Sequence, residues 1–223
     1  MRLTTPLAAL ATAFILTACH DITGAAATTA ASAAAPESLN DDQKYALAFM
    51  WHEEKLAHDL YLALNDVNPA MQLSNIANKS EITHVAMVEA LVKTYDINIT
   101  NLEDYTVAYS EDELRALAPG TFAIPEIQKR YDTLYVQGVE SLAASLETGC
   151  KVEVIDVEDL NGAIATAAGH QDIIDTFELL RSQSYNHYWA FDGALKNLGV
   201  VDGCCSLGER FCKSAEAFPR TMH

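Results

Sequence analysis

Helical periodicity is the feature that most constrains how this chain can fold. From about Leu73 to Tyr95, inward-facing positions recur in steps of four and three, the spacing of one face of an α-helix. Two polar residues, Glu81 and His84, fall on this apolar stripe. Glu-x-x-His at this spacing presents two metal ligands from neighbouring turns of one helix. The competing interpretation is an ordinary solvated pair, and the rest of the sequence has to decide between the two.

Three more segments have the same periodicity. The first helix is predicted to begin at Asn40 or Asp41, which are good N-cap residues, and to end near Leu64. The third runs from Glu126 to Gln137, pauses at Gly138 and continues from Val139 to about Ala168, and the last spans Asp172 to Leu198. Few segments alternate with period two, so the predicted fold class is all-α.

The second and third helices are separated by a long connection, from Asp96 to about Pro125. It contains a short helical patch in which Ser110 and Glu113 form a capping box. A connection of this length is too long for a tight hairpin and suits a crossover along a helical bundle.

Acidic and imidazole side chains also lie on the predicted buried faces of the other helices. Glu53 and Glu54 mark adjoining stripes of the first helix, so at least one of them faces inward. Glu153 lies on the apolar stripe of the third helix, with Asp156 three residues later. His187 lies on the apolar stripe of the last helix. Burying four carboxylates alone would cost several kcal/mol for each ion. Two divalent cations would offset that charge, whereas the alternative is solvent exposure or a Glu–His network without metal.

The N-terminal segment is predicted to lie outside the fold. Arg2, an apolar run from Leu7 to Leu16 and the following Thr17-Ala18-Cys19 are typical of a secretory signal, residues 1–18, with cleavage before Cys19. Its end resembles the lipobox of bacterial lipoproteins, which implies a lipid anchor on Cys19; an ordinary signal with a chance cysteine is the alternative. His20 favours the outer membrane, facing the periplasm. Residues 19–38 are predicted to form a disordered Ala/Thr-rich tether, and residues 39–199 are predicted to form the folded domain.

Charge and cysteine content limit the partners. Fourteen Lys and Arg against 31 Asp and Glu give a net charge of −17, which argues against binding nucleic acid. In an oxidising compartment one or two disulfides are expected, with connectivity left open, among Cys150, Cys204, Cys205 and Cys212. The last three lie in the tail, residues 200–223, where they and His223 could instead bind copper or zinc.

Three motifs resemble a family of bacterial and archaeal ferritin-like domains of unknown function. They are Glu54-Lys55-Leu56-Ala57-His58-Asp59-Leu60-Tyr61, Ser80-Glu81-Ile82-Thr83-His84 and Ser184-Tyr185-Asn186-His187. The resemblance covers roughly residues 39–199 and implies a ferritin-like four-helix bundle related to rubrerythrin. It selects Glu54 over Glu53 and implies a dinuclear metal site formed by Glu54, Glu81, His84, Glu153, Asp156 and His187.

Two positions depart from the rubrerythrin pattern. His58 replaces an arginine of the first helix, and Ser184 replaces the glutamate of the last Glu-x-x-His. Asp156 could supply the missing carboxylate. If Asp156 does not reach the site, we expect a mononuclear centre, or zinc or manganese in place of iron.

The leading hypothesis is a lipid-anchored redox protein that binds two iron ions and acts on dioxygen or peroxide, by oxidising ferrous iron or reducing peroxide. Glu81 and Glu153 would bridge the ions, Glu54 and Asp156 would be terminal, and each histidine would bind one ion. Four aromatic residues could relay electrons, although filling the core is the favoured role: Tyr61, Tyr185, Tyr188 and Trp189. No Cys-x-x-Cys pair is present, so a reductant must come from elsewhere.

Two other hypotheses remain open from the sequence. The first is a lipoprotein that binds or senses metal without catalysis. The second is an envelope interaction module with a degenerate site. The sequence leaves enzymatic turnover and oligomeric state open, including a homodimer.

Overall fold

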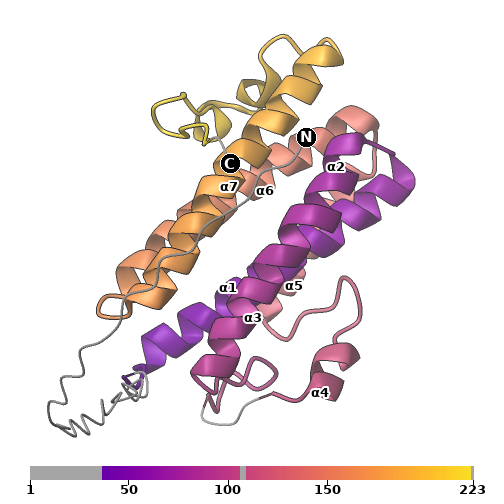
Figure 1. The fold of residues 1–223 in the computed structure, drawn as a ribbon. Coiled ribbons are helices and arrows are strands. Elements are labelled where there is room, and N and C mark those ends of the chain that lie inside the picture. Colours follow the sequence, from indigo (N-terminus) through magenta and orange to yellow (C-terminus); the bar gives the residue numbers. More distant parts are fainter. Residues whose placement is uncertain (1–36, 106–108, 222–223) are drawn as a thin grey trace, which may run out of the picture. The chain divides into compact units, whose positions relative to one another are not determined.

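The computed structural model describes residues 37–105 and 109–221 (Figure 1). Every regular element in these ranges is helical, and none is a strand, which confirms the all-α prediction. The long elements are α1 (Asp41–Val67), α3 (Ile82–Thr94), α5 (Pro125–Gly138), α6 (Leu142–Thr166) and α7 (Gln171–Asn197). The short ones are α2 (Met71–Asn75), the π-helix η1 (Ile76–Glu81), α4 (Glu111–Ala116), and the 3₁₀-helices η2 (Gly203–Leu207) and η3 (Glu209–Phe211).

The first helix begins where its N-cap predicts. The Asn40 side chain accepts a hydrogen bond from the Gln43 backbone, and the Gln43 side chain accepts one from the Asn40 backbone. This reciprocal pair satisfies two backbone donors that a helix start leaves free. The helix continues to Val67, about one turn beyond the predicted end, because the Asn68 N–H still bonds to the Leu64 carbonyl.

The second predicted helix is one continuous segment with an irregular middle. α2, η1 and α3 follow one another directly, and η1 is wound as a π-helix that ends at Glu81. A π turn holds more residues per turn than an α-helix. The helical face before the π turn is therefore rotated relative to the face after it. The prediction of a regular α-helix from Leu73 to Tyr95 is therefore wrong in its middle turn.

The third predicted helix is divided into two separate helices. α5 ends at Gly138, and the Ser141 side chain caps the new helix α6 by accepting from the Ala144 backbone. The predicted restart at Val139 is wrong because this serine cap sets the boundary instead. α5 packs against α1 and α6 as an additional helix.

Four long helical segments pack together around the core: α1, the α2–η1–α3 segment, α6 and α7. α6 and α7 contact each other extensively, α1 packs on α3 and α6, and α3 also contacts α7. Figure 1 shows α1 beside α3 and α6 beside α7. The long connection between α3 and α5 carries α4 and returns the chain to α1.

The apolar core consists of two clusters separated by a polar layer. Along α1, residues up to Trp51 belong to one cluster and residues from Leu56 onward to the other. Along α7, Leu180 belongs to the first cluster and Tyr188 to the second. Between the clusters, at mid-length of each helical segment, lie buried polar side chains: Glu54, Glu81, His84, Glu153, Asp156, Ser184 and His187.

Two disulfides attach the C-terminal tail. Cys150 of α6 is bonded to Cys204 of η2, and Cys205 is bonded to Cys212. These are the pairings that the sequence left open. Because all four sulfurs are oxidised, the alternative copper or zinc site of tail thiolates is not what the structure shows, and His223 lies outside the described residues.

The expectations for the N-terminus fall mostly outside the described residues. The signal segment 1–18, the lipid anchor on Cys19 and the tether as far as residue 36 all lie there. In the part of the chain that the structure describes, none of the helices is both long enough and apolar enough to cross a bilayer.

The contact between α6 and α7 depends on Gly149. A Cβ atom at this position would lie 2.6 Å from ring carbons of the buried Phe191. Gly149→Ala should therefore destabilise the fold by about 1–3 kcal/mol, because the helices must move apart. A methyl group on Gly162, also in α6, would meet no atom within 4 Å, and Gly162→Ala should stabilise by roughly 0.5–1 kcal/mol. Urea unfolding measures the stability of both variants. If Gly149→Ala and Gly162→Ala change the free energy of unfolding in the same direction, this packing is contradicted.

The long connection is attached to α1 through His52, whose Nε2 lies 3.0 Å from the Ile99 carbonyl. Burial outweighs this hydrogen bond and lowers the pKa of His52 to about 4, against 6.5 when exposed. Because the unfolded chain binds the proton first, stability is complete above pH 6.5 and falls toward pH 4, by about 2 kcal/mol at pH 5. In His52→Gln this component of the pH dependence should vanish. Urea unfolding of wild type and His52→Gln from pH 7.5 to 5 measures this component. An equal fall in the free energy of unfolding of both proteins over this range would contradict the prediction.

Candidate metal centre

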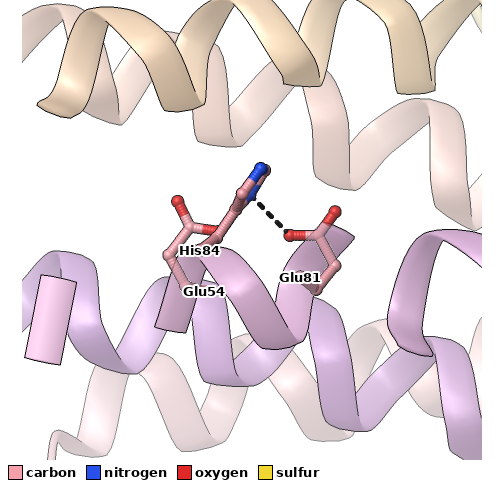
Figure 2. A group of neighbouring side chains, drawn as sticks. All are labelled: Glu54, Glu81 and His84. Atoms are coloured by element: carbon pink, nitrogen blue, oxygen red, sulfur yellow. Dashed lines mark hydrogen bonds and ion pairs between the residues drawn. The ribbon is translucent and has the colours of Figure 1, made fainter. Parts of the chain in front are cut away.

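The first group of candidate ligands comes from three helical elements. Glu54 projects from α1, Glu81 from the last position of η1 and His84 from the first turn of α3 (Figure 2). His84 Nδ1 lies 3.1 Å from Glu54 Oε2 and 3.0 Å from Glu81 Oε2. None of the three residues is more than 2% exposed, and their ligand atoms lie within 4.8 Å of one another.

The second group shares Glu81 with the first. Glu153 projects from α6 and His187 from α7, and their ligand atoms also lie within 4.8 Å of one another and of Glu81. His187 Nδ1 lies 2.9 Å from Glu81 Oε1 and 3.4 Å from Glu153 Oε2. Glu81 thus presents one carboxylate oxygen to each histidine. It is the only residue that belongs to both groups among the described residues.

The π-helix explains how Glu81 reaches both groups. It ends at Glu81, so this residue lies at the junction between a π turn and the regular helix that carries His84. Single π turns inside α-helices occur frequently at functional sites, since they turn one side chain out of the regular helical register. The local winding therefore singles out Glu81 within the segment.

Hydrogen bonds behind the two histidines fix their orientation. His84 Nε2 lies 3.1 Å from Gln183 Oε1, and His187 Nε2 lies 2.8 Å from Ser80 Oγ. The Ser80 hydroxyl donates to Gln183 Oε1. The Gln183 oxygen can only accept, so His84 Nε2 carries the hydrogen between them. The Ser80 hydroxyl donates its single hydrogen to Gln183, so its oxygen accepts a hydrogen bond from His187 Nε2. Both Nδ1 atoms therefore face the carboxylates.

Without a cation, burial and neighbouring charges shift the pKa values of the candidate ligands in this layer. Burial opposes charge on His187, but Glu153 and Glu81 outweigh it and raise its pKa to about 9. Burial also opposes charge on His84, yet Glu81 and Glu54 raise its pKa as well. For Glu54, burial outweighs the attraction of His84 and raises its pKa to about 7. In the absence of metal, protons must occupy the positions between these ligands.

Several lone pairs in this layer have no hydrogen-bond partner. The buried atoms without one include Glu54 Oε1, Glu81 Oε1, Asp156 Oδ1 and His187 Nδ1. His187 Nδ1 and Glu81 Oε1 are close but are not aligned for a hydrogen bond. Unsatisfied buried polar atoms are rare because each costs about 1–3 kcal/mol. Carboxylate oxygens and imidazole nitrogens with outer hydrogen bonds already in place are the donors that a transition metal requires.

Asp156 lies in the same layer but belongs to neither group. Ser184 Oγ donates to Asp156 Oδ2 at 2.7 Å, and Oδ1 has no partner. Burial, followed by the charges of Glu54 and Glu153, raises the pKa of Asp156 well above its usual value. Ser184 of α7 thus supports a carboxylate from α6. The roles of Asp156 as a terminal ligand and of Glu153 as a second bridge stay predictions.

Of the four aromatic residues near the ligands in sequence, only Tyr61 contacts one. Its hydroxyl donates to Glu153 Oε1. The other three contact the C-terminal tail: Tyr188 OH bonds to the Phe211 carbonyl, Trp189 Nε1 to the Phe218 carbonyl, and the Tyr185 ring packs on Phe218. Among the described residues these three serve to attach the tail.

The structure separates the two adjacent glutamates of α1. Glu53 is ion-paired with Arg130 of α5, which also contacts Asp159, whereas Glu54 faces the ligands. His58 of α1 bonds through Nδ1 to Asp59 at 2.9 Å. In the described part of the chain, the hydrogen-bond partner of its ring is Asp59 and not a member of either ligand group.

Sequence reasoning missed the role of Gln183. This side chain connects the outer nitrogens of both histidines, directly to His84 and through Ser80 to His187. An uncharged residue on a partly exposed face gave no signal by itself. Its position one helical turn before His187 could have placed it beside that ligand.

Comparison with known proteins shows the following similarities. The sequence model of a family described as "Uncharacterized protein domain (DUF2202)" matches residues 43–209. The uncharacterized protein MJ0754 of Methanocaldococcus jannaschii is 31% identical over 163 residues, which cover 73% of this chain and 80% of that protein. A crystal structure of hypothetical protein MJ0754 has a TM-score of 0.64 at 30% identity and covers 74% of this chain and 85% of that one.

Proposed function

The chain belongs to the DUF2202 family of uncharacterised domains, and we propose that it binds a pair of iron ions in a ferritin-like four-helix bundle and reacts there with dioxygen or peroxide. The bundle assignment is supported by the four long helical segments, each of which provides at least one side chain to the polar layer. This distribution of ligands is typical of dinuclear carboxylate proteins.

One observation carries the proposal: two ligand groups share Glu81, and buried lone pairs in both lack hydrogen-bond partners. Glu54 and His84 would complete the set for one ion, and Glu153 and His187 the set for the other. Two divalent cations would replace the protons that these side chains must otherwise hold. They would also balance the negative charge of the layer, to which Asp156 contributes.

The donor set contains no thiolate, and its mixture of carboxylate and imidazole suits iron or manganese. Every candidate ligand atom is a carboxylate oxygen or an imidazole nitrogen, and the described cysteines are oxidised to disulfides. Thiolate ligands select copper(I) and zinc, whereas imidazole suits iron among other metals and carboxylate suits manganese. Manganese or zinc in place of iron is a testable alternative.

The metal pair would supply the electrons that reduce dioxygen or peroxide. The protein residues hold and orient the ligands for this purpose. Gln183 and Ser80 keep a hydrogen on each outer histidine nitrogen, which leaves Nδ1 free to bind. The Tyr61 hydroxyl fixes Glu153 and offers a proton beside it. The apolar clusters on both sides of the layer exclude water along the helices.

We also propose that the domain works outside the cytoplasm, attached to the bacterial outer membrane through a lipid on Cys19. The lipobox-like segment supports this location, and the net charge of −17 supports a partner other than nucleic acid. Palmitate labelling of cells expressing wild type and Cys19→Ala tests it. Label that persists in the variant would contradict the anchor.

Addition of ferrous iron to the metal-free protein under air tests the chemistry. We expect oxygen consumption with a rise in near-ultraviolet absorption that saturates at two iron ions per chain, and similar behaviour in Glu53→Gln. Glu53 is the matched control because it adjoins Glu54 but pairs with Arg130. Stoichiometric binding without oxidation would contradict the redox function and leave a metal-binding or sensing protein. No binding would contradict both.

A further inference from the structure

Two uncharged side chains lie on the solvent-facing side of the candidate metal centre. Ser80 lies in η1, directly before Glu81, and Gln183 lies in α7, four residues before His187. Both side chains are half-buried, whereas the histidines that they contact are no more than 8% exposed. On this side of the layer, the imidazole rings therefore meet side chains that reach solvent.

The imidazole rings of His84 and His187 lie side by side. Their centroids are 5.6 Å apart, and the ring planes differ by 26°. Both rings turn Nδ1 toward the carboxylates and Nε2 toward Gln183 and Ser80. Ser80 Oγ also lies 3.5 Å from His84 Nε2. One pair of side chains thus serves the outer nitrogens of both ligand groups.

The hydrogen bonds of this network all lead toward Gln183. His187 Nε2 donates to Ser80 Oγ, and the Ser80 hydroxyl in turn donates to Gln183 Oε1. His84 Nε2 donates to the same Gln183 oxygen. An amide oxygen has two lone pairs, and both are used here. Gln183 is therefore the final acceptor for both histidines, directly for one and through a hydroxyl for the other.

The acceptors of this network carry no charge. In the described part of the chain, the partners of the two outer nitrogens are an amide oxygen and a hydroxyl. A histidine that binds metal usually donates its other N–H to a carboxylate, a carbonyl or water, and this bond raises the basicity of the ring. A neutral acceptor raises it less than a carboxylate does. Gln183 therefore orients its histidine without adding negative charge.

A charge at this position would act unequally on the two oxidation states of iron. A ferric ion carries one more positive charge than a ferrous ion, so a nearby negative charge stabilises the ferric state more. Glutamate has the same size as glutamine and would place that charge behind both imidazoles. The neutral amide omits this stabilisation, and the ferrous state is favoured by comparison.

We propose that Gln183 is a positioning residue for both ligand histidines, and that its neutral amide favours the divalent state of the bound ions. The role rests on the proposed function, because it requires iron in the two ligand groups. It goes beyond that function by assigning control of the reduction potential to a residue that is not itself a ligand.

Gln183→Glu tests the effect of charge. The iron-loaded protein is titrated with a reductant and redox mediators under nitrogen and followed by its near-ultraviolet absorption. The variant should prefer ferric over ferrous iron about tenfold more than wild type does, which lowers the potential by about 59 mV. Gln171→Glu is the matched control, because it adds the same charge to α7 at an exposed position roughly 18 Å away along the helix axis. Its potential should equal that of wild type.

Gln183→Leu tests the effect of the hydrogen bond. Leucine fills similar space but removes the acceptor of His84 Nε2. Isothermal titration under nitrogen should show manganous ion binding about tenfold more weakly than in wild type. Gln183→Glu keeps the acceptor and should bind the ion at least as tightly as wild type. This rescue separates the hydrogen bond from the filling of space.

Three results would overturn the proposal: an unchanged potential in Gln183→Glu, an equal shift in Gln171→Glu, or wild-type manganese affinity in Gln183→Leu. Circular dichroism confirms that each variant is folded. If wild type itself binds no iron, the proposed function fails and the role of Gln183 fails with it. If wild type binds iron and the potential does not respond to Gln183→Glu, only the role of Gln183 fails.

Discussion

Replacing Glu81 by glutamine should abolish binding of both metal ions, with apparent affinity falling at least 100-fold for each. Glu81 presents Oε1 toward His187 and Oε2 toward His84, so it contributes to both ligand groups. Glutamine keeps the size but removes the charge and turns one acceptor into a donor. Isothermal titration with ferrous or manganous ions under nitrogen measures the loss.

Two matched variants separate this effect from a general loss of charge. Glu54→Gln should weaken the binding of one ion more than that of the other, because Glu54 belongs to only one ligand group. Glu53→Gln should leave both ions bound, because Glu53 pairs with Arg130. Glu81→Gln should also remain folded, since it removes a buried charge. Retention of both ions in Glu81→Gln, or their loss in Glu53→Gln, would show that the site has been placed wrongly.

Loss of the Cys150–Cys204 disulfide should be the largest change in stability. The bond closes a loop with a sequence separation of 54 and joins two fully buried residues. The entropy of closing such a loop in the unfolded chain is worth about 4 kcal/mol. The double variant Cys150→Ala/Cys204→Ala should therefore lower Tm by roughly 10 °C. Differential scanning calorimetry measures the shift.

The second disulfide provides the control for this prediction. Cys205 and Cys212 are separated by seven positions, for which the same entropy amounts to about 2 kcal/mol. Cys212 is also exposed, so its loss creates no internal cavity. Cys205→Ala/Cys212→Ala should shift Tm by about half as much. Equal shifts for the two double variants would contradict the loop-entropy explanation.

The helix pattern could be predicted because it depends on local signals. Asn40 and Gln43 form the cap that starts α1, and Ser110 and Glu113 form the predicted capping box of α4. Period-3.6 stripes located the buried side of each long segment. The same stripes placed Glu81, His84, Glu153 and His187 on inward faces, where the structure has them.

The remaining features depend on contacts that no local pattern encodes. The π turn before Glu81 shifts register in the middle of an apparently regular stripe. The choice between Glu53 and Glu54 follows from Arg130, far along the chain on α5. Gln183 contacts His84 from another helix, and the pairing of Cys150 with Cys204 requires that α6 and the tail meet. Each of these needs the tertiary arrangement.

The most direct test of the central claim is diffraction at the iron absorption edge from crystals loaded with iron under nitrogen. Two anomalous peaks are predicted on either side of the Glu81 carboxylate, each about 2 Å from its ligand atoms. One would be bound by Glu54 and His84, and the other by Glu153 and His187. Peaks elsewhere on the chain, or the absence of any peak beside Glu81, would contradict a dinuclear centre in this bundle.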